Sequence, residues 1–186
     1  MSTRILAMVG SLRAGSHNRQ LAEAAVKLAP ESIEVEIYEG LADVPYYNED
    51  LDQPQAVPPA AGALRAAVDS VDALLMVTPE YNGTVPAALK NAVDWLSRPY
   101  HSAVIDNKPV VVIGTSGGRY GGAWAHEDAR KAARIAGATV LDSVALSVPR
   151  AATRFADTPP VCDEVIIAKI PTILDALASA AQTPTD

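Results

Sequence analysis

The segment GSLRAGSHN, Gly10–Asn18, carries the residue types best suited to chemistry in this chain. It lies between a short apolar run and a helical pattern, so its backbone N–H groups would point at a ligand from a helix N-terminus. Hydroxyl and amide side chains add hydrogen-bond donors, and a guanidinium adds a charged fork that matches phosphate oxygens. The segment therefore predicts a phosphate site, whose candidate ligands are Ser11, Arg13, Ser16, His17 and Asn18.

The kind of phosphate follows from what the segment lacks. A Walker A loop for nucleoside triphosphates needs a lysine before its Ser or Thr, and Ser16 directly follows Gly15 instead. The dinucleotide fingerprint needs a second glycine where Leu12 stands, and Glu39 alone is weak evidence for a ribose-binding acid. A compact site for one phosphate, as in flavin mononucleotide (FMN), is the remaining interpretation. The alternative is a polar turn in which Ser16 or Asn18 only caps the helix and Arg13 is solvated.

Two further polar loops follow apolar runs of the chain, at residues 79–84 and 115–122. In the first of them, Asn82-Gly83 is a turn dipeptide that tolerates positive φ, so the backbone can fold tightly against a flat ligand. Tyr81 is predicted to pack beside such a ligand.

The loop after residue 115 also supports a different class of function. Gly114–Gly118 fits G-x-S-x-G, the nucleophile elbow of serine hydrolases, with Ser116 as the nucleophile. That chemistry needs a late histidine base, and only His126 follows Ser116, by ten residues. His101 and His126 are interpreted as surface or structural residues. We favour a small-residue loop that approaches a flavin ring, formed by Ser116, Gly117 and Gly118.

The elements that would position these loops alternate between strand and helix. Strands are predicted near residues 4–9, 33–39, 73–78, 108–115 and 139–148, with helices between them and a last helix over 163–181. Residues 42–62 are predicted to be a long loop, and residues 149–160 a connector. The pattern indicates an α/β fold, a flavodoxin-like doubly wound parallel sheet of five strands in the order 2-1-3-4-5 with helices on both faces. The three polar loops would then meet at the carboxyl edge of the sheet.

Length and composition indicate one domain over residues 1–186, with a frayed C-terminal end from about 181. The formal net charge of −7 argues against a nucleic-acid partner or a membrane surface. Cys162 is the single cysteine, which excludes an internal disulfide and a multi-cysteine metal site, so no metal is expected. No signal peptide or membrane span is visible, and we expect a cytoplasmic protein.

Four segments in order resemble one family: GSLRAGSHNRQL (Gly10–Leu21), YNEDL (Tyr47–Leu51), TPEYNGTVPAALKNAVDWLSRP (Thr78–Pro99) and GTSGGRYGG (Gly114–Gly122). They resemble the NAD(P)H-dependent FMN reductases of the flavodoxin-like fold, the group that includes chromate and quinone reductases. The match is dense from Arg4 to about Val148. Four ordered motifs are far more specific than any one of them.

The resemblance implies FMN as the cofactor, with NADPH or NADH as the hydride donor. Hydride would pass through flavin N5 in ping-pong fashion to a small-molecule acceptor, such as a quinone, an azo compound, a metal oxyanion or free flavin, without a catalytic side chain. The alternative is an FMN-binding electron carrier that does not turn over NAD(P)H. By the same resemblance, the candidates at the pyrimidine edge and N5 are Pro79, Glu80, Tyr81 and Asn82, next to Gly83.

The resemblance also implies a homodimer or homotetramer with flavins near a subunit boundary. Two features of the sequence support association. Trp95 is predicted to lie exposed, off the Leu89/Val93/Leu96 face of its helix, and an aromatic and acidic loop surrounds Tyr46, Tyr47 and Asn48.

Overall fold

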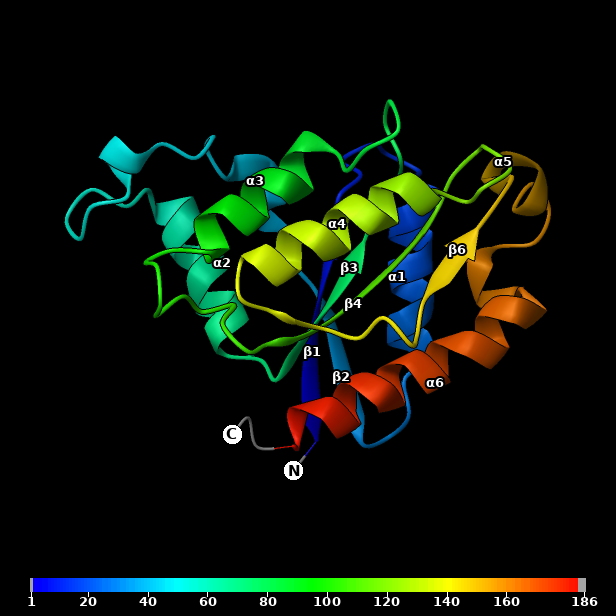
Figure 1. Ribbon diagram of the computed structural model, residues 1–186. Coiled ribbons are helices and arrows are strands. Elements are labelled where there is room, and N and C mark those ends of the chain that lie inside the picture. The colour runs from blue at the N-terminus through cyan, green and yellow to red at the C-terminus, as the bar shows by residue number, and fades with distance from the viewer. Residues whose placement is uncertain (1, 184–186) are drawn as a thin grey trace.

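A parallel sheet with helices on both faces forms the centre of the fold (Figure 1). The computed structural model describes residues 2–183. The strands are β1 (Thr3–Val9), β2 (Ile33–Ile37), β3 (Ala73–Val77), β4 (Pro109–Thr115), β5 (Thr139–Val140) and β6 (Leu146–Val148). They are ordered β2-β1-β3-β4-β5, and β6 also pairs with β4. The predicted flavodoxin-like order is therefore confirmed.

The fifth strand of the prediction is two short strands in the structure. β5 pairs with the beginning of β4, at Pro109 and Val110, and β6 pairs with its end, from Ile113 to Thr115. Between them Asp142 leaves the sheet and accepts a hydrogen bond from Arg134. An Asp-Ser pair favours a turn, so the single strand predicted over 139–148 was wrong at its centre.

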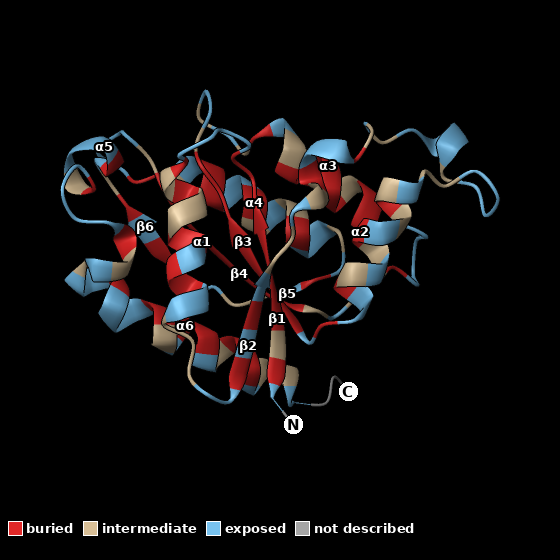
Figure 2. Ribbon diagram, turned by 180° about the vertical axis from the view of Figure 1, so that it is seen from behind, coloured by how far each residue is buried: buried red, intermediate tan, exposed pale blue. Residues whose placement is uncertain are grey.

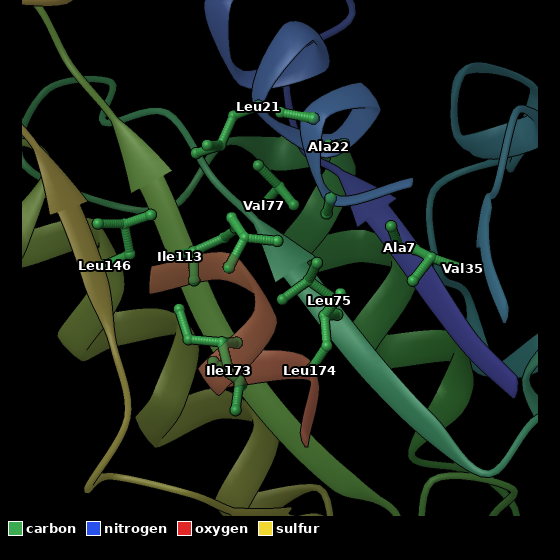
Figure 3. Packing of buried hydrophobic residues seen from close by; sticks show 14 of the residues in the cluster. Ala7, Leu21, Ala22, Val35, Leu75, Val77, Ile113, Leu146, Ile173 and Leu174 are labelled. Carbon is green, nitrogen blue, oxygen red and sulfur yellow. The ribbon is translucent and has the colours of Figure 1, made fainter. Parts of the chain in front are cut away.

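Each central strand is buried on both faces because its alternate side chains enter two separate cores. In β1, Ile5 and Ala7 pack toward α1 (His17–Lys27) and α6 (Glu164–Ala181), whereas Leu6 and Met8 face the opposite layer. That layer holds α2 (Pro59–Asp69), α3 (Ala87–Leu96) and α4 (Ala123–Ile135). Figure 2 shows the buried strands between the helices, and Figure 3 shows the first core, where side chains of α1 and α6 meet the sheet. The continuous apolar runs read from the sequence match this double burial.

Two predicted loops contain more structure than expected. The segment predicted as a loop over 42–62 begins inside a 3₁₀ turn, η1 (Gly40–Asp43), includes η2 (Glu49–Leu51) and ends in α2, which begins at Pro59. A proline suits a first helical position because it has no N–H to satisfy there. The connector over 149–160 holds the short helix α5 (Ala151–Arg154) and leads to η3 (Pro160–Cys162). Helix α6 ends at Ala181, and residues 184–186 of the C-terminal end predicted to be frayed lie outside the described residues.

Trp95 corrects a prediction. Its side chain is fully buried, not exposed. The segment before η2 covers it: Nε1 donates to the Pro45 carbonyl at 2.8 Å, and Tyr47 packs edge-on with ring centroids 5.0 Å apart. The Arg65 guanidinium lies over the indole ring, 5.3 Å from its centroid. Helical periodicity assigned Trp95 to an outer face, and a distant segment of the chain buries that face.

The structure describes no helix that is long and apolar enough to cross a lipid bilayer.

Gly114 allows β4 to pass the end of β3. A Cβ at this position would lie 2.1 Å from the Thr78 carbonyl oxygen and 2.7 Å from His126 Nε2. Neither a backbone carbonyl nor a buried ring can move away at little cost. The absence of a side chain here therefore sets the spacing of two strand ends at the edge where the polar loops begin.

Gly114→Ala should lower the free energy of unfolding by about 1–3 kcal/mol, because overpacking of this size displaces backbone. Urea unfolding measures the change. The control is Gly62→Ala inside α2, where the nearest atom to a new Cβ is 4.0 Å away. That variant should gain about 0.5–1 kcal/mol from helix propensity. Equal stability of the two variants would contradict the packing argument.

Candidate functional site

Three loops meet at the carboxyl edge of the sheet, as the topology requires. The first follows β1, the second follows β3 and the third follows β4. Main-chain hydrogen bonds carry the pairing up to the loops: Gly10 N donates to Val77 O at 2.9 Å, and Thr78 N donates to Ile113 O at 2.9 Å. The loops therefore begin from fixed positions.

The first loop presents unpaired backbone donors. Among residues 2–183, no acceptor binds the N–H groups of residues 11–15, nor those of His17 and Asn18. Ser16 caps α1 by accepting from Arg19 N at 3.3 Å, which leaves its hydroxyl proton free to donate. The first turn of α1 holds no acidic residue. This cluster of N–H groups is the arrangement that binds an anion.

Two of the predicted phosphate ligands are also engaged elsewhere. The Asn18 side chain is 4% exposed and makes two bonds of 2.9 Å to Thr115, from Nδ2 to the carbonyl and from the Thr115 N–H to Oδ1. It therefore fastens α1 to the end of β4, and one amide proton remains for a ligand. The Nδ1 atom of His17 lies 3.2 Å from Gln20 Oε1, within hydrogen-bond distance. Arg13 is exposed, and the only hydrogen bond of its side chain within the described chain is to the Ala14 carbonyl.

The second loop is a two-residue hairpin turn. Tyr81 and Thr84 exchange backbone hydrogen bonds of 3.1 and 3.2 Å, and Asn82 and Gly83 have φ values of 53° and 78°. Positive φ at both central residues defines a type I′ turn, for which Asn-Gly is a preferred pair. The expected tight turn is confirmed. The Tyr81 hydroxyl lies 3.4 Å from Ser11 Oγ, which links this loop to the first one.

Glu80 has a structural role that the sequence did not reveal. Its Oε2 accepts from Trp124 N at 3.1 Å and Ala125 N at 3.3 Å, at the first turn of α4. That helix has Gly122 at its N-cap and receives no side-chain bond from it. The carboxylate thus caps a helix 44 residues further along the chain. No local capping pattern could have indicated this, because the capping group is distant in sequence.

The third loop is anchored to the segment after β6. Ser116 N donates to Val148 O at 3.2 Å, and Ala151 N donates to Ser116 O at 3.0 Å. Ser116 Oγ accepts from Gly118 N at 3.1 Å. At Gly117 an added Cβ would meet no atom within 4 Å, so the loop borders open space where a flat ring can approach.

His126 is a buried residue behind this loop, not a surface one. Its Nδ1 lies 2.8 Å from Ser147 Oγ, and its Nε2 has no hydrogen-bond partner of good geometry among residues 2–183. Burial lowers the pKa of His126 to about 4; the Arg130 guanidinium lowers it as well, and the Thr78 carbonyl opposes part of the shift. A neutral ring with its proton on Nε2 would direct that proton toward Thr78.

The same geometry argues against Ser116 as the nucleophile of a serine hydrolase. A serine nucleophile needs a histidine hydrogen-bonded to its oxygen. In the described part of the chain, Ser116 Oγ is bonded to a backbone N–H, and the nitrogen of His126 that has a partner faces Ser147. The arrangement therefore lacks a catalytic dyad.

The residues present fit an FMN phosphate and isoalloxazine. Within residues 2–183, the first loop offers to a phosphate unpaired N–H groups, hydroxyls and a guanidinium that has no carboxylate partner. The second offers a tight polar turn beside Tyr81, and the third offers side-chain-free backbone next to open space. Among the residues that the structure describes, no group of three His, Cys, Asp or Glu could hold a metal ion.

Sheet order, switch-point position and phosphate-type loop define a flavodoxin-like α/β protein. The NADPH-dependent FMN reductase family matches residues 3–153, and the chain belongs to that family. The resemblance stated from the four motifs is therefore confirmed, and so is the expected enzyme class, an NAD(P)H-dependent FMN reductase.

Individual relatives agree with this assignment. A 2-hydroxy-1,4-benzoquinone reductase of a Burkholderia species is 42% identical over 130 residues, which cover 70% of this chain and 69% of the relative. A quinone reductase of Pseudomonas putida is 40% identical over 147 residues, covering 79% and 75%. FerB, a flavoenzyme NAD(P)H:(acceptor) oxidoreductase from Paracoccus denitrificans, has a TM-score of 0.85 at 32% identity, with 97% of each chain covered.

The shifted pKa of His126 predicts a pH-dependent stability. Folding lowers the pKa from 6.5 to about 4, so the unfolded state binds the extra proton between these values. The free energy of unfolding should therefore fall by about 3 kcal/mol as pH drops through this window. Above the window, the contribution of the neutral imidazole to stability is complete. Urea unfolding at several pH values measures it.

His126→Gln should remove this dependence, and His101→Asn, at an exposed histidine, should keep it. Parallel pH profiles for wild type and His126→Gln would show that this histidine is not the group responsible.

Proposed function

We propose that the protein is an FMN-dependent oxidoreductase that takes hydride from NADPH or NADH and reduces a small-molecule acceptor, with quinones as the first class. The observation that carries the proposal is the set of N–H groups at the start of α1 that find no acceptor within the described chain, next to Arg13, which has no carboxylate partner there. An acidic protein with net charge −7 needs such a local positive site to hold a phosphate.

The relatives support the choice of acceptor. The Burkholderia and Pseudomonas putida proteins are named as reductases of benzoquinone and quinone. Azo compounds, metal oxyanions and free flavin remain further candidate acceptors. A nicotinamide donor is an intracellular metabolite, which supports a cytoplasmic location.

The chain's residues would bind and orient the cofactor and would leave the redox chemistry to it. Ser11, Arg13, Ser16, His17 and Asn18 would hold the phosphate. Pro79, Glu80, Tyr81, Asn82 and Gly83 would border the pyrimidine edge, and Ser116, Gly117 and Gly118 the ring. FMN, when bound, supplies N5, the atom through which hydride would pass from the nicotinamide to the small-molecule acceptor in ping-pong fashion. No side chain needs to act as a nucleophile or base.

The decisive experiment is anaerobic addition of NADPH or NADH to the FMN-saturated protein. A reductase should lose its yellow absorbance within the time of mixing and regain it when a quinone is added. An electron carrier would keep the oxidised spectrum. Chromatography of the flavin released by denaturation should give FMN, because the first loop is a compact site for one phosphate and lacks the dinucleotide fingerprint. FAD in its place would contradict the proposal.

Arg13→Ala should weaken FMN binding about tenfold or more, because a charged hydrogen bond to phosphate is lost. Quenching of flavin fluorescence measures the dissociation constant. Arg134→Ala, which removes the same charge from the far end of α4, is the control and should bind FMN as wild type does. Unchanged affinity in Arg13→Ala would assign Arg13 to solvent.

We also propose that the protein is a homodimer or a homotetramer built from two such dimers. Trp95 no longer supports this, because it is buried. A groove of about 1360 Å³ between α3 and α4 supports it instead, since it begins at Thr84 beside the Asn82-Gly83 turn. Tyr100 and Ile135 line this groove with 72% and 75% of their surface exposed. Lysines and aspartates both line it, and such a surface can pair with itself about a two-fold axis.

Ile135→Glu should shift the protein toward monomer, because it introduces a charge into a surface that association would bury. Light scattering at micromolar concentration measures the mass. The control is Ile167→Glu on α6, where an exposed isoleucine lies on a helix that does not line the groove. A monomeric wild type would contradict the proposal directly.

A further inference from the structure

The arginines of this protein fall into two groups. Most pair with a carboxylate: Arg4, Arg19, Arg65, Arg130, Arg134 and Arg154. Within residues 2–183, the salt bridges include none for Arg13, Arg98, Arg119 and Arg150. All of the latter except Arg98 lie on loops at the carboxyl edge of the sheet. In an acidic protein, guanidinium groups left unpaired at one edge indicate an anionic ligand.

Arg119 lies on the third loop and Arg150 on the segment after β6. Arg119 directly follows Gly118, and Arg150 N donates to Gly118 O at 3.1 Å, so their backbones are adjacent. Both side chains are exposed. Arg150 has a φ of 55°, an uncommon left-handed conformation for a residue other than glycine. The bond to Gly118 and that from Ala151 N to Ser116 O hold it there.

Two exposed aromatic rings lie on the Arg119 side of this segment. The Arg119 guanidinium is stacked over Tyr120, with Cζ 4.5 Å from the ring centroid. Tyr120 and Trp124 have ring centroids 5.8 Å apart and are 51% and 56% exposed. Gly83 of the second loop would bring a Cβ within 3.7 Å of the indole, so the rings border the predicted flavin site. An exposed aromatic pair beside the Arg119 guanidinium, with Arg150 adjacent along the backbone, suits a ligand that has both a flat ring and phosphates.

We propose that Arg119, Arg150, Tyr120 and Trp124 form a subsite for the adenosine-phosphate half of the nicotinamide donor. The arginines would bind its phosphates and the aromatic rings its adenine. A small oxyanion would need the charges but not the rings. This inference rests on the proposed function, since it assigns the donor of that reaction to one side of the site.

The test compares Arg119→Gln, Arg150→Asn and the double variant in the FMN-saturated protein. Asn is chosen at 150 because it tolerates left-handed backbone. Each single variant should raise the KM for NADPH by about twofold to fivefold, the range for an exposed charged contact, and leave kcat and FMN affinity unchanged. Arg119→Lys should recover part of the loss. Lys169→Gln on α6 removes a charge elsewhere and should match wild type.

A second measurement does not depend on turnover. Calorimetric titration of the FMN-saturated protein with 2′,5′-adenosine bisphosphate should show binding that the double variant weakens about tenfold or more. Inorganic phosphate should bind far more weakly than this probe. Equal binding of inorganic phosphate would overturn the nucleotide assignment in favour of a simple oxyanion site.

Other outcomes separate this inference from the proposed function. If NADPH reduces the flavin of wild type and the variants keep the wild-type KM, the subsite is wrong and the function stands. If the variants lose FMN affinity, these arginines belong to the FMN site and the subsite is again wrong. If wild type binds FMN but NAD(P)H does not reduce it, the proposed function fails, and the subsite for its donor fails with it.

Discussion

The pair of hydrogen bonds between the Asn18 side chain and the backbone of Thr115 is the contact on which the arrangement of the site depends. It is buried, it spans 97 residues of sequence, and it joins the first turn of α1 to the last residue of β4. A buried amide that lost these partners would cost about 1–3 kcal/mol. The bond fixes the position of the first loop relative to the third.

A second set of contacts keeps the opposite side of the edge in place. Glu80 caps α4 at the N–H groups of Trp124 and Ala125. The next residue of that helix, His126, is hydrogen-bonded to Ser147 on β6. Gly114 leaves room for the Thr78 carbonyl and the imidazole. These contacts involve polar groups that can be buried only because each meets a partner or stays neutral. These contacts fix the ends of the strands, and they leave the solvent-facing backbone of the loops free to contact a ligand.

The charge distribution divides the molecule. The chain carries net charge −7. At the carboxyl edge of the sheet, however, Arg13, Arg119 and Arg150 have no carboxylate partner within the described residues. The first turn of α1 contains no acidic residue that would compete for its N–H groups. Anionic parts of a cofactor and of its donor would therefore be drawn to one edge by local fields, against the repulsion of the whole. Family membership and this local pattern point to the same chemistry through independent observations.

The sequence by itself determined the features that depend on neighbouring residues. Apolar runs that alternate with helical patterns predicted the central strands and, through the fold class, the sheet order, and Asn82-Gly83 predicted a tight turn because both residues accept positive φ. Contacts between distant segments were decided only by the tertiary structure. Trp95 is buried because the segment before η2 folds across it, and the side chains of Glu80 and Asn18 find partners more than forty residues away. Helical periodicity describes one element alone, so it cannot say which face a remote loop will cover or which helix a remote carboxylate will cap.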